Sequence, residues 1–440
     1  MNDEERIDLA EWAMNLAIKS GASGAAVEIN SQRRVEVEVR DGKLDKLTEA
    51  QQNRLSIDIY LEKRFSAHST NDLRRSALEK FIGDAADSTH YLSRDEFRAL
   101  PDPKYYPEIG DGDLAIFDPA YERMETEHRV KLAQEIETAA RAGSDKIISS
   151  TGGYSDSYSE FVRVHSNGFL GGARGTRFEA SAEVSIQDEG GARPDDWCAA
   201  ETRFRKDLPD PAILGAKAVE RVLRKIGQKK IESGQYDCLV ENRAARRLLR
   251  MLQEPLGARA LQQKSSFLDG MLGKRVGSSR LTMIDDPTIE KGLASRFFDG
   301  EGLAARRMPI FESGMLRNYY IDTYYGRKLG MEPTAGGPSN IIFEYGTRSL
   351  EEIAKDIEKG ILVEGFIGGN SNSTTGDFSV GVAGMLIEKG ELTRPIHEMN
   401  ISGNARELLK HLAEVGNDPY IHSAMRTPSM LFEGVHFSGI

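Results

Sequence analysis

Apolar and polar residues alternate strictly in two stretches near the start of the chain. Every second residue is valine over part of "RRVEVEVRDG" (33–42), and every second residue is leucine or isoleucine over part of "RLSIDIYLEKR" (54–64). Two further alternating runs flank "HSNGFLGG", where Asn167-Gly168 is a turn signal. A period of two predicts antiparallel strands in a sheet that is covered on one face.

A spacing of three to four residues replaces this alternation elsewhere and predicts helices. The first follows a capping residue at Asn2 or Asp3 and ends before Gly21, and a second begins near Asn71. Amphipathic runs predict further helices over about 122–142, 212–226 and 404–416, and one that begins near Arg246 and is interrupted at Glu254-Pro255.

The second half of the chain is rich in glycine and in strand patterns. We expect strands in "YDCLVEN", "ILVEGFIGG", "DFSVGVAGMLIEKGEL" and "PSMLFEGVHF", and a hairpin in "RMPIFESGMLRNYYID". Helices and strands do not alternate regularly, which favours an α+β fold: an N-terminal antiparallel sheet with helices, and a strand-rich, barrel-like C-terminal domain. The polar segment "QKKIESGQY" divides the chain into domains 1–228 and 229–440, with a possible subdivision near the prolines of 100–120.

The charge balance argues against some classes of function. Acidic residues outnumber basic ones, 69 to 58, for a net charge of −11 and a pI near 5.4. Direct binding to nucleic acid is therefore not expected. We find neither a span of about 18 apolar residues nor a signal peptide, so no membrane association is expected. Two distant cysteines, Cys198 and Cys238, suit a reducing compartment, and we expect a cytoplasmic protein.

One short motif begins like the helix of a zinc peptidase. His397-Glu398 would need a second histidine four or five residues later, but Ile401 and Ser402 stand there. None of the eight histidines lies between residues 166 and 396. His422 or His436 could approach His397 in space, but a polar surface segment is the simpler interpretation.

Glycines and hydroxyl residues gather in "GGNSNSTTGDFS" (368–379), which could cradle an anion through backbone N–H groups. The segment lacks the ending of a P-loop and runs into a strand, so turn chemistry is favoured over nucleotide binding. Ser265, Ser266, Thr374 and Thr375 lack the surroundings of a catalytic nucleophile. The four tyrosines of "RNYYIDTYYGRKLG" favour core packing or a subunit interface, with a ligand-lining role as the alternative.

Several segments together resemble one family. They include "VEVEVRDGKLDKLTEAQQNRLSIDIY", "VHSNGFLGG", "KSSFLDGMLGKRV", "DGEGLAARRMPIFESGMLRNYYIDTYYGRKLG" and "GGNSNSTTGDFSVGVAGMLIEKGEL". In order and character they resemble the TldD/PmbA proteins, also called modulators of DNA gyrase, over nearly the whole chain. The resemblance implies an N-terminal α+β domain, a strand-rich C-terminal domain and a cytoplasmic, ring-like dimer that encloses a cavity.

The resemblance also implies a peptidase in two parts. The family's TldD subunit holds zinc on an HExxxH helix and on a cysteine of the strand after a "TTGEF" turn, whereas its partner TldE (PmbA) lacks these ligands. Together they cleave short or unfolded peptides, and they are linked to the maturation of a peptide antibiotic and to turnover of a toxin's antidote.

The zinc ligands of TldD can be carried over by position. In one register the HExxxH residues fall on Arg250, Met251 and Pro255. A register shifted by one residue gives Leu249, Arg250 and Glu254. The cysteine falls on Val382. These six residues, which we call the family zinc positions, supply no zinc-ligand set, and Glu254 is the only possible donor among them.

The chain therefore resembles TldE/PmbA. We expect no cofactor in this chain, zinc in a TldD-like partner, a heterodimer with that partner or a homodimer in isolation, and binding of unfolded or short peptides. An extended peptide could pair with a strand edge here. The candidate residues for that edge are Gly368, Gly369, Asn370, Thr375, Gly376 and Phe378.

Two alternatives stay open. One is a free-standing homodimer that binds peptides or another ligand without catalysis. The other is an enzyme with an unrecognised, metal-independent site, for which the Ser/Thr-rich loops or His397-Glu398 would be the candidates.

Overall fold

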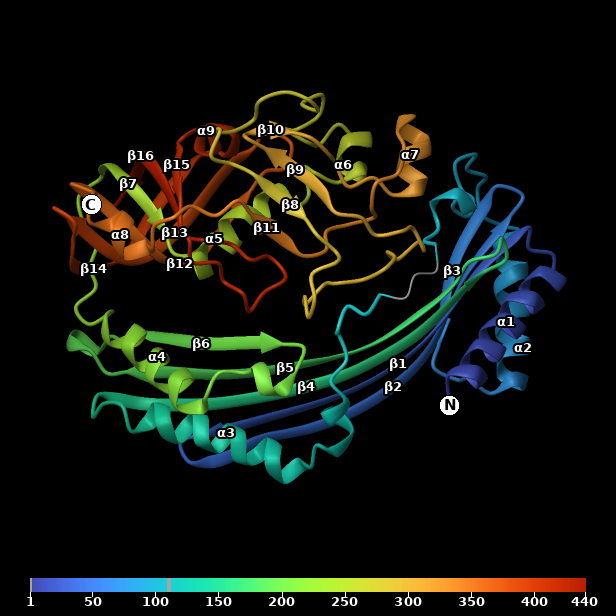
Figure 1. Ribbon diagram of the computed structural model, residues 1–440, viewed down its shortest axis with the longest axis horizontal. Helices are drawn as coiled ribbons and strands as arrows, with labels where there is room; N and C mark the ends of the chain where they lie inside the picture. Colours follow the sequence, from blue (N-terminus) through green and yellow to red (C-terminus); the bar gives the residue numbers. More distant parts are fainter. Residues whose placement is uncertain (1, 109–111) are drawn as a thin grey trace.

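The computed structural model describes residues 2–108 and 112–440, which form two lobes (Figure 1). A long, curved sheet with helices makes up the N-terminal lobe, and the strand-rich C-terminal lobe lies over its concave side. The predicted α+β class is confirmed. Among the described residues, no helix has the length and apolar character needed to cross a membrane.

Six antiparallel strands form the N-terminal sheet, in the order β3-β2-β1-β4-β5-β6. Their bounds are β1 Gly24–Arg40, β2 Lys43–Leu61, β3 Arg64–Thr70, β4 Ile147–His165, β5 Leu170–Ile186 and β6 Asp195–Thr202. The predicted strands are confirmed but are longer than the alternating segments, since β1 has 17 residues and β2 has 19. The extra length of β2, residues 43–54, is exposed and pairs with β1 through its backbone. Because no side chain of this stretch is buried, its sequence shows no apolar–polar alternation.

Four helices cover one face of this sheet: α1 Asp3–Lys19, α2 Arg75–Thr89, α3 Thr126–Arg141 and α4 Pro211–Leu223. On β1, Val27 and Ile29 pack under α1 and α2, whereas Val35 and Val37 pack under α3. Successive side chains of a strand point to opposite faces, and these four residues are all odd-numbered on β1, so they share a face. The opposite, polar face is turned toward the C-terminal lobe (Figure 1), which confirms a sheet covered on one side by helices.

The proline-rich segment 99–119 lies between α2 and α3 of the N-terminal lobe and contacts the C-terminal lobe. Its described residues form no strand and no α-helix. They include a 3-10 turn at Pro103–Tyr105, and a second 3-10 turn, Pro119–Arg123, begins at the last residue of the segment. Residues 109–111 lie outside the described part. The Ala304 N–H donates to the Tyr105 carbonyl and the Lys291 N–H to the Leu114 carbonyl, each at 2.8 Å. The segment therefore runs along the C-terminal lobe. The division at residues 228/229 falls between α4 and the next strand.

Five strands of the C-terminal lobe close into a barrel, which confirms the predicted barrel-like domain. Their bounds are β7 Gly234–Val240, β12 Lys359–Ser371, β13 Asp377–Glu388, β14 Glu391–Asn404 and β16 Met430–Ser438. The order is β14-β13-β12-β7-β16, and β16 pairs back with β14 at Ile401↔Phe437. Only β7 and β12 run parallel. One large apolar core lies inside this lobe.

Smaller elements complete the lobe. A second sheet has the order β10-β9-β8-β11, and its strands are β8 Met283–Asp285, β9 Met308–Glu312, β10 Met315–Leu316 and β11 Ile341–Phe343. The predicted β9–β10 hairpin is confirmed, and its tip residues Ser313 and Gly314 both have positive φ, as a type I′ turn requires. The short helices are α5 Asn242–Leu249, α6 Ala258–Gln262, α7 Thr323–Leu329, α8 Leu350–Ala354 and α9 Ala405–Lys410.

The predicted helix over 404–416 is wrong in its second half. Helix α9 ends at Lys410, and β15 (Leu412–Val415) follows it directly. Leu412 and Val415 are buried where β15 pairs with β16. Strand pairing therefore overrides the local helical spacing, because it buries the same apolar side chains against the barrel.

Candidate functional site

Helix α5 stands where the resemblance places the zinc helix. It begins at Asn242 rather than near Arg246, and its backbone tightens into a 3-10 turn, Arg250–Leu252, directly after Leu249. The α-helix therefore ends a few residues before the predicted interruption at Glu254-Pro255. Its buried face packs into the barrel core through Ala244, Ala245, Leu248 and Leu249.

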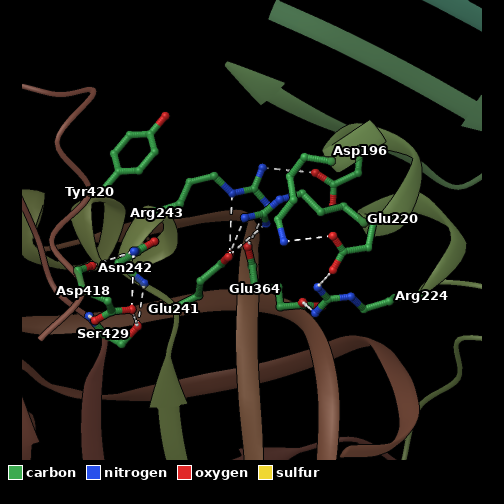
Figure 2. A network of polar contacts seen from close by, with 12 residues as sticks. Asp196, Glu220, Arg224, Glu241, Asn242, Arg243, Glu364, Asp418, Tyr420 and Ser429 are labelled. Carbon is green, nitrogen blue, oxygen red and sulfur yellow. Dashed lines mark hydrogen bonds and ion pairs between the residues drawn. The ribbon is translucent and has the colours of Figure 1, made fainter. Parts of the chain in front are cut away.

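The start of α5 is held by a side chain from the segment just before β16. The Asn242 N–H donates to the Ser429 hydroxyl at 3.1 Å, which satisfies one of the free donors of the first turn. Ser429 in turn donates to a carboxylate oxygen of Asp418 at 2.7 Å, and Asp418 also accepts the Ser429 N–H. Figure 2 shows these residues grouped beside the helix. The helix is thus held rigidly on the barrel.

The family zinc positions do not converge on a metal site. Leu249 and Val382 lie inside the apolar core at 2% and 0% exposure, and Pro255 is buried. Arg250 and Glu254 are exposed. Zinc needs three or four nitrogen, sulfur or oxygen donors in one place, and buried hydrocarbon cannot supply them. These residues therefore do not fit a zinc ion.

His397-Glu398 lies at a break in β14. The pairing of β13 with β14 shifts between Val382 and Gly384, opposite these two residues, and Glu398 has a positive φ of 54°. Burial lowers the pKa of His397, and Glu398 pairs with Lys230 at 3.6 Å. In the part of the chain that the structure describes, no three His, Cys, Asp or Glu side chains gather as a metal site would require.

The turn between β12 and β13 is shaped by its own polar side chains. The Asn372 carboxamide oxygen accepts the N–H groups of Thr374 and Thr375 at 2.9 and 3.3 Å, and Asp377 accepts the Thr375 hydroxyl at 2.7 Å. The Asn404 side-chain amide donates to the Thr375 carbonyl at 2.9 Å. These hydroxyls and amides are occupied within the turn, which supports turn chemistry over anion binding.

The glycines before this turn form a bulge in β12. Gly368 and Gly369 both have positive φ, and the pairing with β13 shifts there. A Cβ on Gly369 would lie 2.4 Å from the Ser379 carbonyl oxygen, so only glycine fits. Beside the bulge lies an open hollow of about 540 Å³, lined by Asn370, Ser371, Asn372, Ser373, Asp377, Phe378 and Ser379.

Only one of the two strands has a free edge here. β13 is paired with β12 on one side and with β14 on the other, and Phe378 is buried at 7% exposure. The backbone of Phe378 is therefore not available to a peptide. β12 pairs with β7 only as far as Val363, which leaves residues 364–371 with an unpaired side. The candidate edge narrows to β12 and includes Gly368, Gly369 and Asn370.

Arginines from α5 reach this free side of β12. Arg247 donates to the Gly368 carbonyl at 2.7 Å, and Arg243 donates to the Glu364 carbonyl at 3.3 Å. Ile367, between them, is 41% exposed. The edge therefore offers main-chain groups and an exposed apolar side chain, although the carbonyls of Glu364 and Gly368 are already bound by these arginines.

Arg243 also ties the two lobes together (Figure 2). It donates to the Asp196 carboxylate at 3.1 Å and to the Trp197 carbonyl at 3.0 Å, both on β6, and lies over the Trp197 ring at 4.6 Å. Burial alone would raise the pKa of Asp196, but the charges of Arg243 and Lys225 outweigh it and the pKa is lowered. The ion pair therefore stabilises the contact of the lobes at neutral pH.

Glu364 lies next to this contact and is also buried. It accepts a hydrogen bond from Arg224 of α4 at 2.9 Å. Burial and the nearby charge of Glu241 raise its pKa, against the influence of Arg224 and Arg221. Sequence reasoning overlooked Glu364 and Arg243; the one available signal was a lone acid inside the apolar strand "ILVEGF".

We expect Glu364→Gln to stabilise the protein at pH 7. The raised pKa means that the ionised carboxylate is disfavoured in the folded state, so the wild type loses stability as pH rises through that pKa. Glutamine carries no charge and escapes this loss. Urea unfolding should give a higher midpoint for the variant at pH 7 and equal midpoints near pH 4. A lower midpoint at pH 7 would contradict the expected direction.

Known proteins with similar sequences and structures bear on this geometry. Residues 233–439 match the PmbA/TldA metallopeptidase C-terminal domain, and residues 119–226 match the central domain. Metalloprotease PmbA of Escherichia coli O157:H7 is 30% identical, over 99% of this chain and 97% of its own length.

Two solved structures share the fold. A protein from Bacteroides thetaiotaomicron, named as a modulator of DNA gyrase, superposes with a TM-score of 0.97 at 42% identity and full coverage of both chains. TldE from Thermococcus kodakarensis superposes at 0.86 with 23% identity, over 98% of this chain and 100% of its own, which indicates a shared fold. By sequence and by structure, this chain belongs to the PmbA/TldD family of metallopeptidase-like proteins.

Proposed function

We propose that this chain is the non-metal-binding, TldE-like subunit of a TldD/TldE-type metallopeptidase complex. The observation that carries the proposal is the chemistry of the family zinc positions. Leu249 and Val382 put hydrocarbon into the apolar core, and Glu254, the one carboxylate, is exposed in the turn after α5. A single carboxylate cannot form a zinc site.

In this proposal zinc belongs to a TldD-like partner. A bound zinc ion there would polarise the peptide carbonyl and generate hydroxide at neutral pH. This chain contributes the other wall of the chamber and holds the substrate. It pairs with the TldD-like chain as a heterodimer, or with a second copy of itself when alone.

The free side of β12 supports a role in holding peptides. An extended peptide that adds to a strand edge is held by main-chain hydrogen bonds, which place little demand on its sequence. The glycines of the bulge allow a second backbone to approach closely. Only unfolded or short peptides present a free backbone of this kind, so they are the expected substrates.

Mixing experiments test this function. The chain is purified alone and together with a TldD-like chain, and hydrolysis of an unfolded peptide is measured for each chain and for the mixture. We expect no hydrolysis by this chain alone and chelator-sensitive hydrolysis by the mixture. Hydrolysis by this chain alone that survives a chelator would contradict the proposal and would favour a metal-independent enzyme.

A further inference from the structure

Arg98 is held between two aromatic rings where the lobes meet. Its guanidinium carbon lies 3.6 Å from the ring centre of Tyr324 on α7 and 4.4 Å from that of Phe65 on β3. Contact with two aromatic rings restricts the orientation of a guanidinium and leaves N–H groups free for hydrogen bonds. Within residues 2–108 and 112–440, the Arg98 side chain has no hydrogen-bond or ion-pair partner.

The neighbouring cations differ from Arg98 because each is already paired. Arg94 binds Glu62 at 2.8 Å, and Lys328 binds Asp95 at 3.3 Å. Arg327 donates to the backbone carbonyls of residues 97, 99 and 100. Arg98 therefore differs from Arg94, Arg327 and Lys328: its N–H groups are free, whereas theirs already bind carboxylates or carbonyls.

Two hollows meet at Arg98, with volumes of about 500 and 490 Å³. The second is also lined by Arg296, whose Nε is buried without a hydrogen-bond partner in the described structure. Arg296 also donates to the Gly337 carbonyl at 2.6 Å, so a ligand in this space would meet the free donors of Arg98 and the positive charge of Arg296.

The carboxylates around these hollows accept hydrogen bonds from other groups. Asp299 and Asp322, which line the second hollow, accept backbone N–H groups of residues 301, 303 and 336 and of residue 325, respectively. Asp95 accepts the Tyr324 hydroxyl at 2.6 Å and the Phe97 N–H at 3.1 Å. Glu301 accepts the Thr323 N–H at 2.8 Å and its hydroxyl at 2.7 Å. Burial raises the pKa of Asp58 on β2, and the charge of Arg98 offsets this only in part. None of these acids lies within ion-pair distance of Arg98 in the described structure.

The support of the site is rigid. The bond from Tyr324 to Asp95 and the three bonds from Arg327 fasten the Arg98 loop to α7. A cation held in place before binding loses little side-chain entropy when a ligand arrives.

We propose that Arg98 is the centre of a carboxylate-binding site. The edge of a guanidinium carries parallel N–H donors that match the two oxygens of a carboxylate. The inference that the carboxylate belongs to a short peptide rests on the proposed function. The inference that the site binds a carboxylate rests on the geometry of Arg98 alone. The carboxylate would come from the C-terminus of the peptide or from an acidic side chain.

Calorimetric titration of the full chain tests the site with four probes: N-acetyl-Ala-Ala, the same dipeptide as its C-terminal amide, N-acetyl-glutamate amide and inorganic phosphate. We expect N-acetyl-Ala-Ala to bind and its amide to bind at least tenfold more weakly, since a charge-assisted bond contributes about 1.5–3 kcal/mol. Equal binding by N-acetyl-glutamate amide would support the site and identify acidic side chains as a source. Tighter binding of phosphate, equal binding of the C-terminal amide, or no binding by any probe would overturn the proposal.

Variants locate the binding. Arg98→Gln and Arg98→Lys should each weaken binding of N-acetyl-Ala-Ala, the first by about tenfold or more, whereas Arg94→Gln should not. If an Arg98 variant fails to fold, Tyr324→Leu replaces it, and loss of the ring should weaken binding. Unchanged binding in folded Arg98→Gln would overturn the site. Peptide hydrolysis by this chain alone would overturn the proposed function and leave the site standing.

Discussion

Replacing Arg243 by alanine is expected to lower the free energy of unfolding by about 3–5 kcal/mol, the range for breaking a buried ion pair from one side. The Arg243 and Asp196 side chains are 9% and 7% exposed. The variant would leave Asp196 with Lys225, at 3.1 Å, as its remaining cation. It would also remove the donor shared by Trp197 of β6 and Glu364 of β12.

The control for this variant is Arg247→Ala on the same helix. Arg247 is exposed and makes one hydrogen bond, to the Gly368 carbonyl. Its removal should cost about 1 kcal/mol or less. Urea unfolding at pH 7 measures both variants. Similar losses for the two would show that the contact between the lobes does not depend on Arg243.

Gly369→Ala should both destabilise the protein and weaken its binding of peptides. The residue has a φ of +89°, and a Cβ would lie 2.4 Å from the Ser379 carbonyl oxygen and 2.6 Å from the Val380 Cα. Backbone strain of this kind costs about 1–3 kcal/mol before the clash is counted. The bulge must shift to relieve it, and the free side of β12 shifts with it.

Gly365→Ala in the same strand is the matched control. Gly365 lacks a positive φ, and a Cβ there would meet nothing within 4 Å. Its stability should change by less than about 0.5 kcal/mol. Thermal unfolding and the anisotropy of a labelled, unfolded peptide are measured for both variants. Normal peptide affinity in a folded Gly369→Ala variant would remove β12 as the binding edge.

Much of the fold could be predicted because burial leaves a periodic pattern. The valines of β1 and the leucine and isoleucines of β2 identify the helix-covered face of the sheet. Residues 43–54 could not be predicted as strand, because backbone pairing and exposed polar contacts hold them and no apolar face is buried. Leu412 and Val415 fit a helix locally, and only the position of β16 makes them a strand.

The candidate site was less predictable. The absence of zinc ligands at Leu249 and Val382 could be predicted from residue type, since neither side chain can bind zinc. The free side of β12 exists because its pairing with β7 stops at Val363. The sequence of β12 alone carries no information about where that pairing stops. Arg243 and Asp196 lie on different lobes, so their pairing emerges only when the chain is folded. Interactions between distant segments of this kind leave no local signal.

Zinc content is the most direct test of the central claim that this chain carries no catalytic metal. The chain is purified without a partner, incubated with an excess of zinc and desalted, and bound zinc is measured by mass spectrometry against protein concentration. The TldD-like chain, treated in the same way, is the positive control. We expect stoichiometric zinc in the control and only trace zinc in this chain. One zinc ion per molecule of this chain would contradict the claim.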